Sequence, residues 1–202
     1  PARARGGGST RPRPTPWPAS TRQARAPAEV PAPRPAPRAA AACVVTSVED
    51  SGPGTLRACL EAATSGSRVS FDASVFPPGN PSTIRVETRL PRLAAGGVTI
   101  DASGAGVVLD GSRAQRTDSG GQAGIWIASD GNEVRGLQIV RFAGNGVSIA
   151  QGSDNLIAGN VLSANSSGIE IRGERSGRNV VAGNLIGVGA DGKTGMANEN
   201  GI

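Results

Sequence analysis

The sequence predicts an all-β fold, a three-faced solenoid of short parallel strands that follows a capping helix and a disordered N-terminal tail. The main observation is a phrase of Gly with two alternating apolar positions, which returns every 22 residues at 124–127, 146–149 and 168–171. A second phrase, Asn-x-Val/Ile-x-Gly, lies between these copies at 132–136, 155–159 and 179–183. A fixed period of this length is typical of solenoids, and alternation of β-branched residues indicates strands with one buried face.

Each repeat divides into three short strands. In the copy at 146–165 these are 146–149, 155–159 and 160–162, and Gly or Asn stands at nearly every break. Gly and Asn tolerate the left-handed backbone that sharp corners need. Three strands and three corners in about 22 residues describe one coil of a parallel β-helix, and coils must stack to bury their apolar faces.

Stacking predicts which side chains share an interior column. Two such columns are expected, Ile125, Val147 and Ile169 in one and Ile127, Ile149 and Ile171 in the other. Asn132, Asn155 and Asn179 are expected to form a corner column, where their amides can bond to one another. A polar ligand site is the alternative interpretation of these Asn residues, and the spacing favours the structural ladder.

Residues 1–42 have a different composition, with ten prolines, eight arginines and one acid, Glu29. Such a segment cannot bury enough apolar surface to offset its ordering entropy, so a disordered Pro/Ala/Arg-rich tail is expected. Its charge is +7 (eight Arg minus one Glu), whereas the rest carries 13 basic and 15 acidic residues, or −2. The basic charge therefore belongs to the tail. Non-specific polyanion binding is one use for it, but no specific nucleic-acid partner is expected.

The folded body is expected to span 43–202, with early, less regular strands at 43–48, 69–72, 82–86, 98–100 and 107–109. Apolar residues at helical spacing predict a capping helix over about 54–63, with Asp50 or Ser51 as its cap. No stretch is long and apolar enough for a membrane span, and no signal peptide is present. Because the chain lacks an initial Met and ends at 201–202 on half a repeat, we expect a fragment that continues into further coils.

The only two cysteines, Cys43 and Cys59, lie on the first strand and on the apolar stripe of the helix. A disulfide between them is the favoured interpretation and fits an extracytoplasmic compartment. Two buried free thiols are the alternative. A metal site is disfavoured because the chain has no His.

Several of these segments together resemble the bacterial right-handed parallel β-helix repeat proteins of the pectate-lyase-like superfamily. The segments are 45–57, 69–72, 97–101 and the Asn-containing repeats, and the resemblance covers about 43–202. It implies, with the right-handed crossover rule, a right-handed solenoid. It also implies a large secreted or surface protein, whose relatives are polysaccharide lyases, hydrolases, adhesins or surface-layer proteins.

The catalytic motifs of the enzyme branches are absent from this sequence. It has no His and no Asp-Asp pair, and the acids of the regular coils are scattered over Asp130, Asp154, Glu170 and Glu174. Arg172 is a candidate proton-abstracting base, although a solvated pair with Glu170 is the favoured interpretation. No metal or cofactor is expected; the resemblance allows calcium, but no residue pattern indicates it.

One candidate binding surface lies on the outward positions of the Gly-containing phrases, where Trp126, Ser148 and Glu170 should stack, with Arg172 nearby. An exposed Trp126 would give a platform for the apolar face of a sugar ring. The alternative is a Trp covered by the loop at 113–120 or by another segment. The inserted residues 188–195 are expected to form a loop, either on a working face or as a simple turn around Asp191-Gly192.

We therefore expect a rigid β-helical module of a secreted or cell-surface bacterial protein that binds polysaccharide or a surface glycan, or acts in adhesion. The alternative is a polysaccharide lyase or hydrolase whose catalytic coils lie beyond residue 202. Fold alone does not decide between them.

Overall fold

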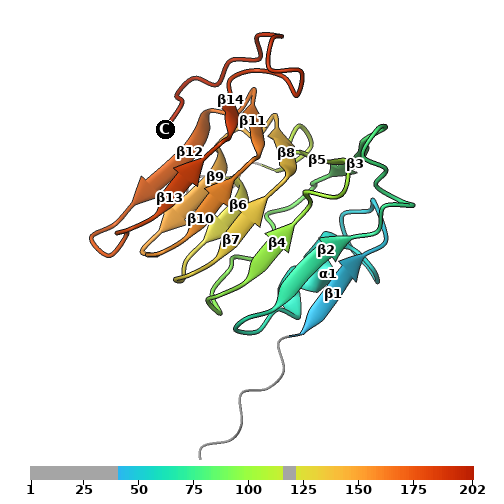
Figure 1. Cartoon of the computed structure of the whole chain (residues 1–202), viewed down its shortest axis with the longest axis horizontal. Coiled ribbons are helices and arrows are strands. Elements are labelled where there is room, and N and C mark those ends of the chain that lie inside the picture. Colours follow the sequence, from blue (N-terminus) through green and yellow to red (C-terminus); the bar gives the residue numbers. More distant parts are fainter. Residues whose placement is uncertain (1–40, 116–121) are drawn as a thin grey trace, which may run out of the picture. The chain divides into compact units, whose positions relative to one another are not determined.

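The computed structural model describes residues 41–115 and 122–202. The predicted tail, apart from its last two residues, lies outside this part, as does most of the 113–120 loop. The described strands form three parallel sheets that are stacked coil by coil (Figure 1). The all-β solenoid predicted from the repeats is confirmed.

The first sheet has six strands, in the order β1 (Ala42–Val45), β2 (Arg68–Phe71), β4 (Thr99–Asp101), β7 (Glu133–Arg135), β10 (Leu156–Ala158) and β13 (Val180–Ala182). The second has β3 (Ser82–Arg85), β5 (Val107–Asp110), β8 (Leu137–Val140), β11 (Val161–Ser163) and β14 (Leu185–Ile186). The third has β6 (Ala123–Ile127), β9 (Asn145–Ala150) and β12 (Ser167–Arg172). Every strand pairs with the equivalent strand of the next coil, so the sheets run along the solenoid axis.

The interior columns have the predicted register. Ile125 pairs with Val147 and Val147 with Ile169, and all three are buried. In the neighbouring column Ile127 and Ile149 are fully buried, whereas Ile171 is 37% exposed because β12 is the last strand of its sheet. Burial of the columns therefore depends on a covering coil, as expected of a stacked repeat.

The corners are built from left-handed residues and Asn side chains. Gly131, Asp154 and Arg178 have φ of +69°, +57° and +53°, and each stands directly before an Asn of the predicted column. Asn132 and Asn155 are about 1% exposed and bond to each other and onward to Asn179. This column is therefore an amide ladder, as the spacing indicated.

The other two corners carry Asn ladders that the sequence interpretation missed. Asn160 accepts a hydrogen bond from the Leu137 N–H and donates its own N–H to Asn184. Asn165 likewise accepts a hydrogen bond from the Phe142 N–H and donates its own N–H to Asn198. The signal was present in the chain, because Asn160 and Asn184 each follow the Gly that ends the second repeated phrase.

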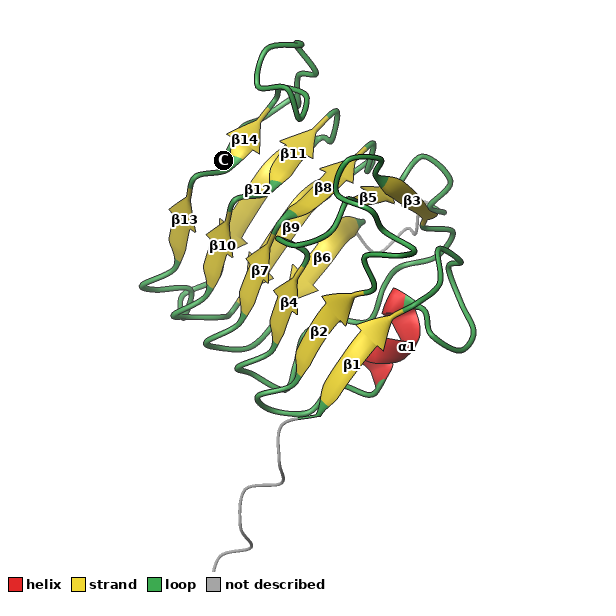
Figure 2. Cartoon of the chain, turned by 45° about the vertical axis from the view of Figure 1, so that its right-hand side comes forward, coloured by secondary structure: helices red, strands yellow, loops and turns green. Residues whose placement is uncertain are grey.

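The capping helix is shorter than predicted. It spans Leu56–Glu61 (α1), and its N-cap is Thr55, which accepts a hydrogen bond from the Ala58 N–H, so the expectation of a cap at Asp50 or Ser51 was wrong. Asp50 instead pairs with Arg57 at 2.9 Å. Figure 2 shows α1 beside β1 and β2 at the N-terminal end of the stack.

A disulfide joins Cys43 of β1 to Cys59 of α1, with Cα atoms 5.7 Å apart. This confirms the predicted pairing. Cys59 is buried among Leu56 and Leu60, so the bond fixes the apolar side of the helix against the first strand.

The inserted residues 188–195 form a turn closed by an antiparallel bridge between Val188 and Gly195. Asp191 organises it, since its carboxylate accepts hydrogen bonds from the N–H groups of Lys193 and Thr194 and from the Thr194 hydroxyl. These bonds, that from the Thr194 side chain most of all, lower the pKa of Asp191 to about 2. The side chains of Asp191 and Thr194 are therefore committed to the turn itself.

Candidate functional site

The predicted outward row on the third sheet exists, but it does not form an exposed platform. Trp126 pairs in register with Ser148, and Ser148 with Glu170. However, Ser148 is only 3% exposed, and the Trp126 ring is partly buried beneath the guanidinium of Arg89, whose Cζ lies 4.9 Å from the ring centroid. The structure agrees with the alternative of a Trp126 covered by another chain segment, because the segment before Leu93 folds over the ring; the substantial exposure that a sugar platform requires is not found.

The polar groups of the row largely bond to one another. The Glu170 carboxylate accepts hydrogen bonds from the Asn145 amide at 2.8 Å and from the Ser148 hydroxyl at 3.0 Å. Arg172 approaches the same carboxylate at 3.4 Å. The expected Glu170–Arg172 pair is therefore present at the surface. Glycan binding by the row of Trp126, Ser148, Glu170 and Arg172 stays a prediction, with little unused hydrogen-bonding capacity to support it.

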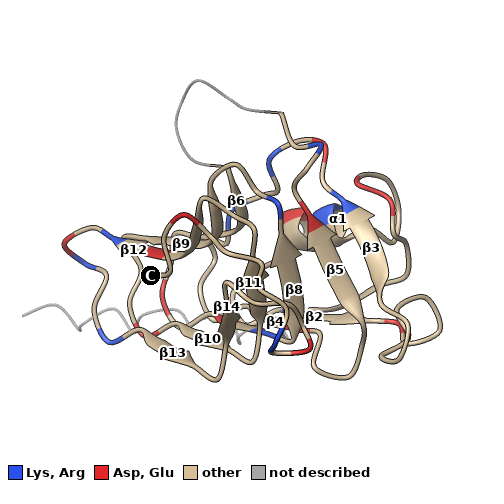
Figure 3. Cartoon of the chain, turned by 90° about the horizontal axis from the view of Figure 1, so that it is seen from above, with Lys and Arg blue, Asp and Glu red and all other residues tan. Residues whose placement is uncertain are grey.

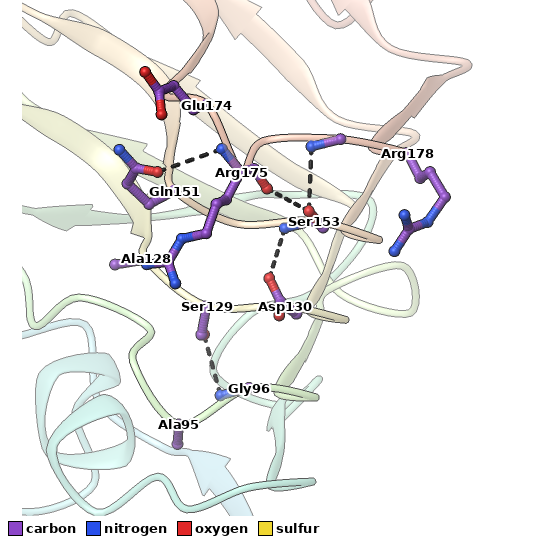
Figure 4. Close-up of a pocket in the computed structure, with 11 residues that line it drawn as sticks. Ala95, Gly96, Ala128, Ser129, Asp130, Gln151, Ser153, Glu174, Arg175 and Arg178 are labelled. Atoms are coloured by element: carbon purple, nitrogen blue, oxygen red, sulfur yellow. Dashed lines mark hydrogen bonds between the residues drawn. The ribbon is translucent and has the colours of Figure 1, made fainter.

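A larger concave surface lies over the corner between the third and first sheets. This corner groove has a volume of about 680 Å³ and is lined by consecutive turns of the stack. Figure 4 shows its lining, which consists of Ala95, Gly96, Ala128, Ser129, Asp130, Gln151, Ser153, Glu174, Arg175, Gly177 and Arg178.

The floor of the corner groove is held by hydrogen bonds between successive turns. The Gly96 N–H donates to the Ser129 hydroxyl, and the Ser153 N–H donates to Asp130 Oδ1 at 2.7 Å. Ser153 also donates its hydroxyl to the Arg175 carbonyl. Backbone hydrogen bonds connect the same turns, so the groove has a rigid base. Its turns repeat coil by coil in the same register as the Asn ladder.

The last turn of the lining, at 173–178, is anchored at both sides. The Arg175 N–H donates to Gln151 Oε1 at 3.4 Å, and Arg178 makes a two-pronged pair with Asp154, with N–O distances of 2.7 and 2.6 Å. The hydrogen bond from Arg178 lowers the pKa of Asp154, and the same bond raises the pKa of Arg178. Figure 3 shows positive and negative residues alternating along this loop after β12.

Two charged groups of the lining, on Glu174 and Arg175, are not paired within the protein's described segments. The Arg175 side chain extends from its loop toward the turn that holds Ala128 and Ser129 (Figure 4). Within the described parts of the chain, neither its guanidinium nor the Glu174 carboxylate has a side-chain partner. These groups are available to a ligand.

The sequence interpretation treated Asp130, Asp154 and Glu174 as scattered turn formers, and it did not name Ser129, Gln151, Ser153 or Arg175. The structure brings Asp130 and Glu174 to one groove and uses Asp154 as an anchor. A signal existed, because most of these residues stand one to five positions before Asn132, Asn155 or Asn179, at the corner that each ladder Asn marks.

The described residues contain neither a cluster of metal-ligating side chains nor a membrane-spanning helix. Among residues 41–115 and 122–202, no three acidic or Cys side chains are grouped so that they could hold a metal ion. No described helix is long and apolar enough to cross a membrane.

Three parallel sheets, left-handed corners and internal amide ladders define a β-solenoid. Residues 83–201 match a protein-family model described as a right-handed β-helix region, and since this is more than half of the chain, the protein belongs to that family. No curated protein and no solved structure matched the chain.

Proposed function

We propose that the chain is a rigid β-helical module of a secreted or cell-surface bacterial protein, and that it binds a polysaccharide along the corner groove. The observation that supports this most is the groove itself, a polar channel built from successive coils on a hydrogen-bonded floor. A binding surface of this kind is fixed before the ligand arrives, so little ordering entropy opposes binding.

The composition of the groove suits a sugar chain. Carboxylate, amide and guanidinium groups of Asp130, Gln151 and Arg175 can pair with sugar hydroxyls, which both donate and accept. Ala95 and Ala128 leave room for the apolar face of a ring. Successive turns of the lining lie about 4.8 Å apart along the solenoid axis, so different polar groups meet an extended polymer at regular intervals.

The compartment is inferred from the disulfide between Cys43 and Cys59, because such bonds persist in oxidising surroundings. Bacterial origin rests on the resemblance of the repeats. Adhesion is a second use of the same surface, since a glycan of another cell would occupy the same groove.

Binding is tested with the full chain and a panel of oligosaccharides by isothermal titration calorimetry. We expect Arg175→Ala to weaken binding about tenfold, because it removes the one cationic lining group that has no carboxylate partner in the described structure. Arg85→Ala is the matched control, since Arg85 is exposed on β3 and does not line the groove. Equal effects of the two substitutions would contradict the proposal.

The titration products also test the enzymatic alternative. Intact oligosaccharide after long incubation supports a binding module, whereas shortened or unsaturated products would favour a polysaccharide lyase or hydrolase. Trp126→Ala in the same assay tests the row on the third sheet as the binding surface.

A further inference from the structure

The charge of the corner groove restricts the kind of polysaccharide that fits it. Its charged lining residues are Asp130, Glu174, Arg175 and Arg178. Arg178 is neutralised by its two-pronged pair with Asp154. Two carboxylates and one guanidinium of the lining then remain without a neutralising partner in the described residues, a net charge of −1 (one positive minus two negative).

The two carboxylates need hydrogen-bond donors. One oxygen of Asp130 accepts the Ser153 N–H, and its second oxygen takes no hydrogen bond from any residue in the described segments. Glu174 is exposed, and neither of its carboxylate oxygens takes a hydrogen bond within that part of the structure. Sugar hydroxyls supply donors for these positions, whereas a carboxylated or sulfated chain brings further acceptors and like charge.

The hydrogen-bond donors of the groove do not reverse this preference for sugar hydroxyls over anionic groups. Arg175 is the one cation of the lining without a carboxylate partner in the described structure, and the Gln151 amide carries no charge, with its oxygen occupied by the Arg175 N–H. One guanidinium can donate to a hydroxyl oxygen as well as to an anion. An anionic chain that reached Arg175 would also lie near Asp130 and Glu174, whose repulsion would offset the attraction.

We infer that the corner groove binds an uncharged, hydroxyl-rich polysaccharide and discriminates against an acidic one, with Asp130 and Glu174 as the residues that determine this specificity. The inference rests on the proposed function and specifies its ligand class. Asp130 and Glu174 act as acceptors for sugar hydroxyls and, at the same time, as repulsive groups toward uronates.

The test compares two linear hexasaccharides of the same β-1,4 linkage, one of glucose and one of glucuronate. Each ring of the glucose hexamer carries a hydroxymethyl group where each ring of the glucuronate hexamer carries a carboxylate. We expect the full chain to bind the neutral hexamer at least tenfold more tightly at low salt. Added salt should narrow the difference, since it screens repulsion between exposed charges.

Two conservative variants assign the discrimination to the groove. Asp130→Asn keeps the oxygen that accepts the Ser153 N–H, and Glu174→Gln changes a side chain with no internal partner in the described residues. The double variant should bind the glucuronate hexamer several-fold more tightly than the unsubstituted chain does. Glu49→Gln, an exposed acid outside the groove, should leave both affinities unchanged.

The outcomes separate the inference from the proposed function. Equal or tighter binding of the glucuronate hexamer would overturn the inference while leaving a glycan-binding module. Binding of neither hexamer, nor of any oligosaccharide in the panel, would overturn the proposed function as well. A preference for the neutral hexamer that the double variant does not change would place the discrimination outside the groove and also overturn the inference.

Discussion

Asn155 receives two hydrogen bonds from Asn132 on one side-chain oxygen, one from the backbone N–H and one from the side-chain amide, both at 2.8 Å. Asn155 then donates in the same way to Asn179, at 3.0 Å for each bond. The side-chain oxygen of Asn155 thus accepts the backbone N–H of the Asn one coil earlier. The backbone N–H of Asn155 is in turn accepted by the side-chain oxygen of the Asn one coil later.

Removal of the middle amide should destabilise the fold. Asn155→Ala leaves the buried N–H of Asn132 without its acceptor and removes one acceptor of the Asn132 side-chain amide, and we expect a loss of about 2 to 3 kcal/mol in the free energy of unfolding. Urea unfolding measures the change. Asn80→Ala, at an exposed loop position, is the control and should alter stability by less than about 0.5 kcal/mol.

Reduction of the disulfide should loosen the N-terminal cap. The bond between Cys43 and Cys59 closes a loop with a sequence separation of 16, and loops of this size contribute about 3 kcal/mol in the chain-entropy estimate. We expect the Cys43→Ala/Cys59→Ala variant to unfold at a lower temperature than the oxidised chain. Identical melting curves with and without reductant, or two thiols titrated in the oxidised protein, would contradict this.

Trp126→Ala should reduce stability, because its ring packs beneath the Arg89 guanidinium and its Nε1 is buried. Loss of apolar burial and of the cation–π contact together predicts about 2 kcal/mol. Chemical unfolding measures the loss. In a Trp17→Phe background, slow quenching of Trp126 fluorescence by iodide would support the covered ring, and quenching as fast as that of free tryptophan would count against it.

Acid should weaken the pair between Asp110 and Arg141, which lie 2.7 Å apart. Burial alone would raise the pKa of Asp110, but hydrogen bonds from Arg141 and Ser112 outweigh it, and the net pKa is lowered from 3.8. A carboxyl whose folded pKa is depressed stabilises the fold above its unfolded pKa, and this contribution is lost as pH falls through the folded value. Stability should therefore be level near neutral pH and fall below about pH 3.8.

The pH experiment has its own comparison variant. Asp110→Asn should be less stable than the unsubstituted chain at pH 7 and should lose less stability between pH 5 and pH 2, since one titrating group has been removed. Urea midpoints across this range measure both effects. Parallel curves for the two proteins would show that Asp110 contributes nothing to the acid sensitivity.

The period of 22 to 24 residues was sufficient by itself to determine the architecture, because a repeat that cannot bury its apolar face alone has to stack on its neighbours. It determined the interior columns through Ile125, Val147 and Ile169, and the corner ladder through Asn132, Asn155 and Asn179. Outside the repeats, the apolar stripe of the helix placed Cys59 on its buried side and made a disulfide with Cys43 the favoured interpretation, which the structure confirms.

Only the tertiary structure decided which surface is open. The alternation of apolar and polar residues predicts which side chains point outward. Whether an outward side chain is exposed depends on whether another segment covers it. Arg89, 37 residues before Trp126, lies over the Trp126 ring. The corner groove depends on turns from separate coils, and the side chains of Asp130, Gln151 and Arg175 become neighbours only when those turns stack. A repeat thus specifies its own core through local spacing, whereas a binding surface arises from irregular residues whose proximity is set by long-range packing.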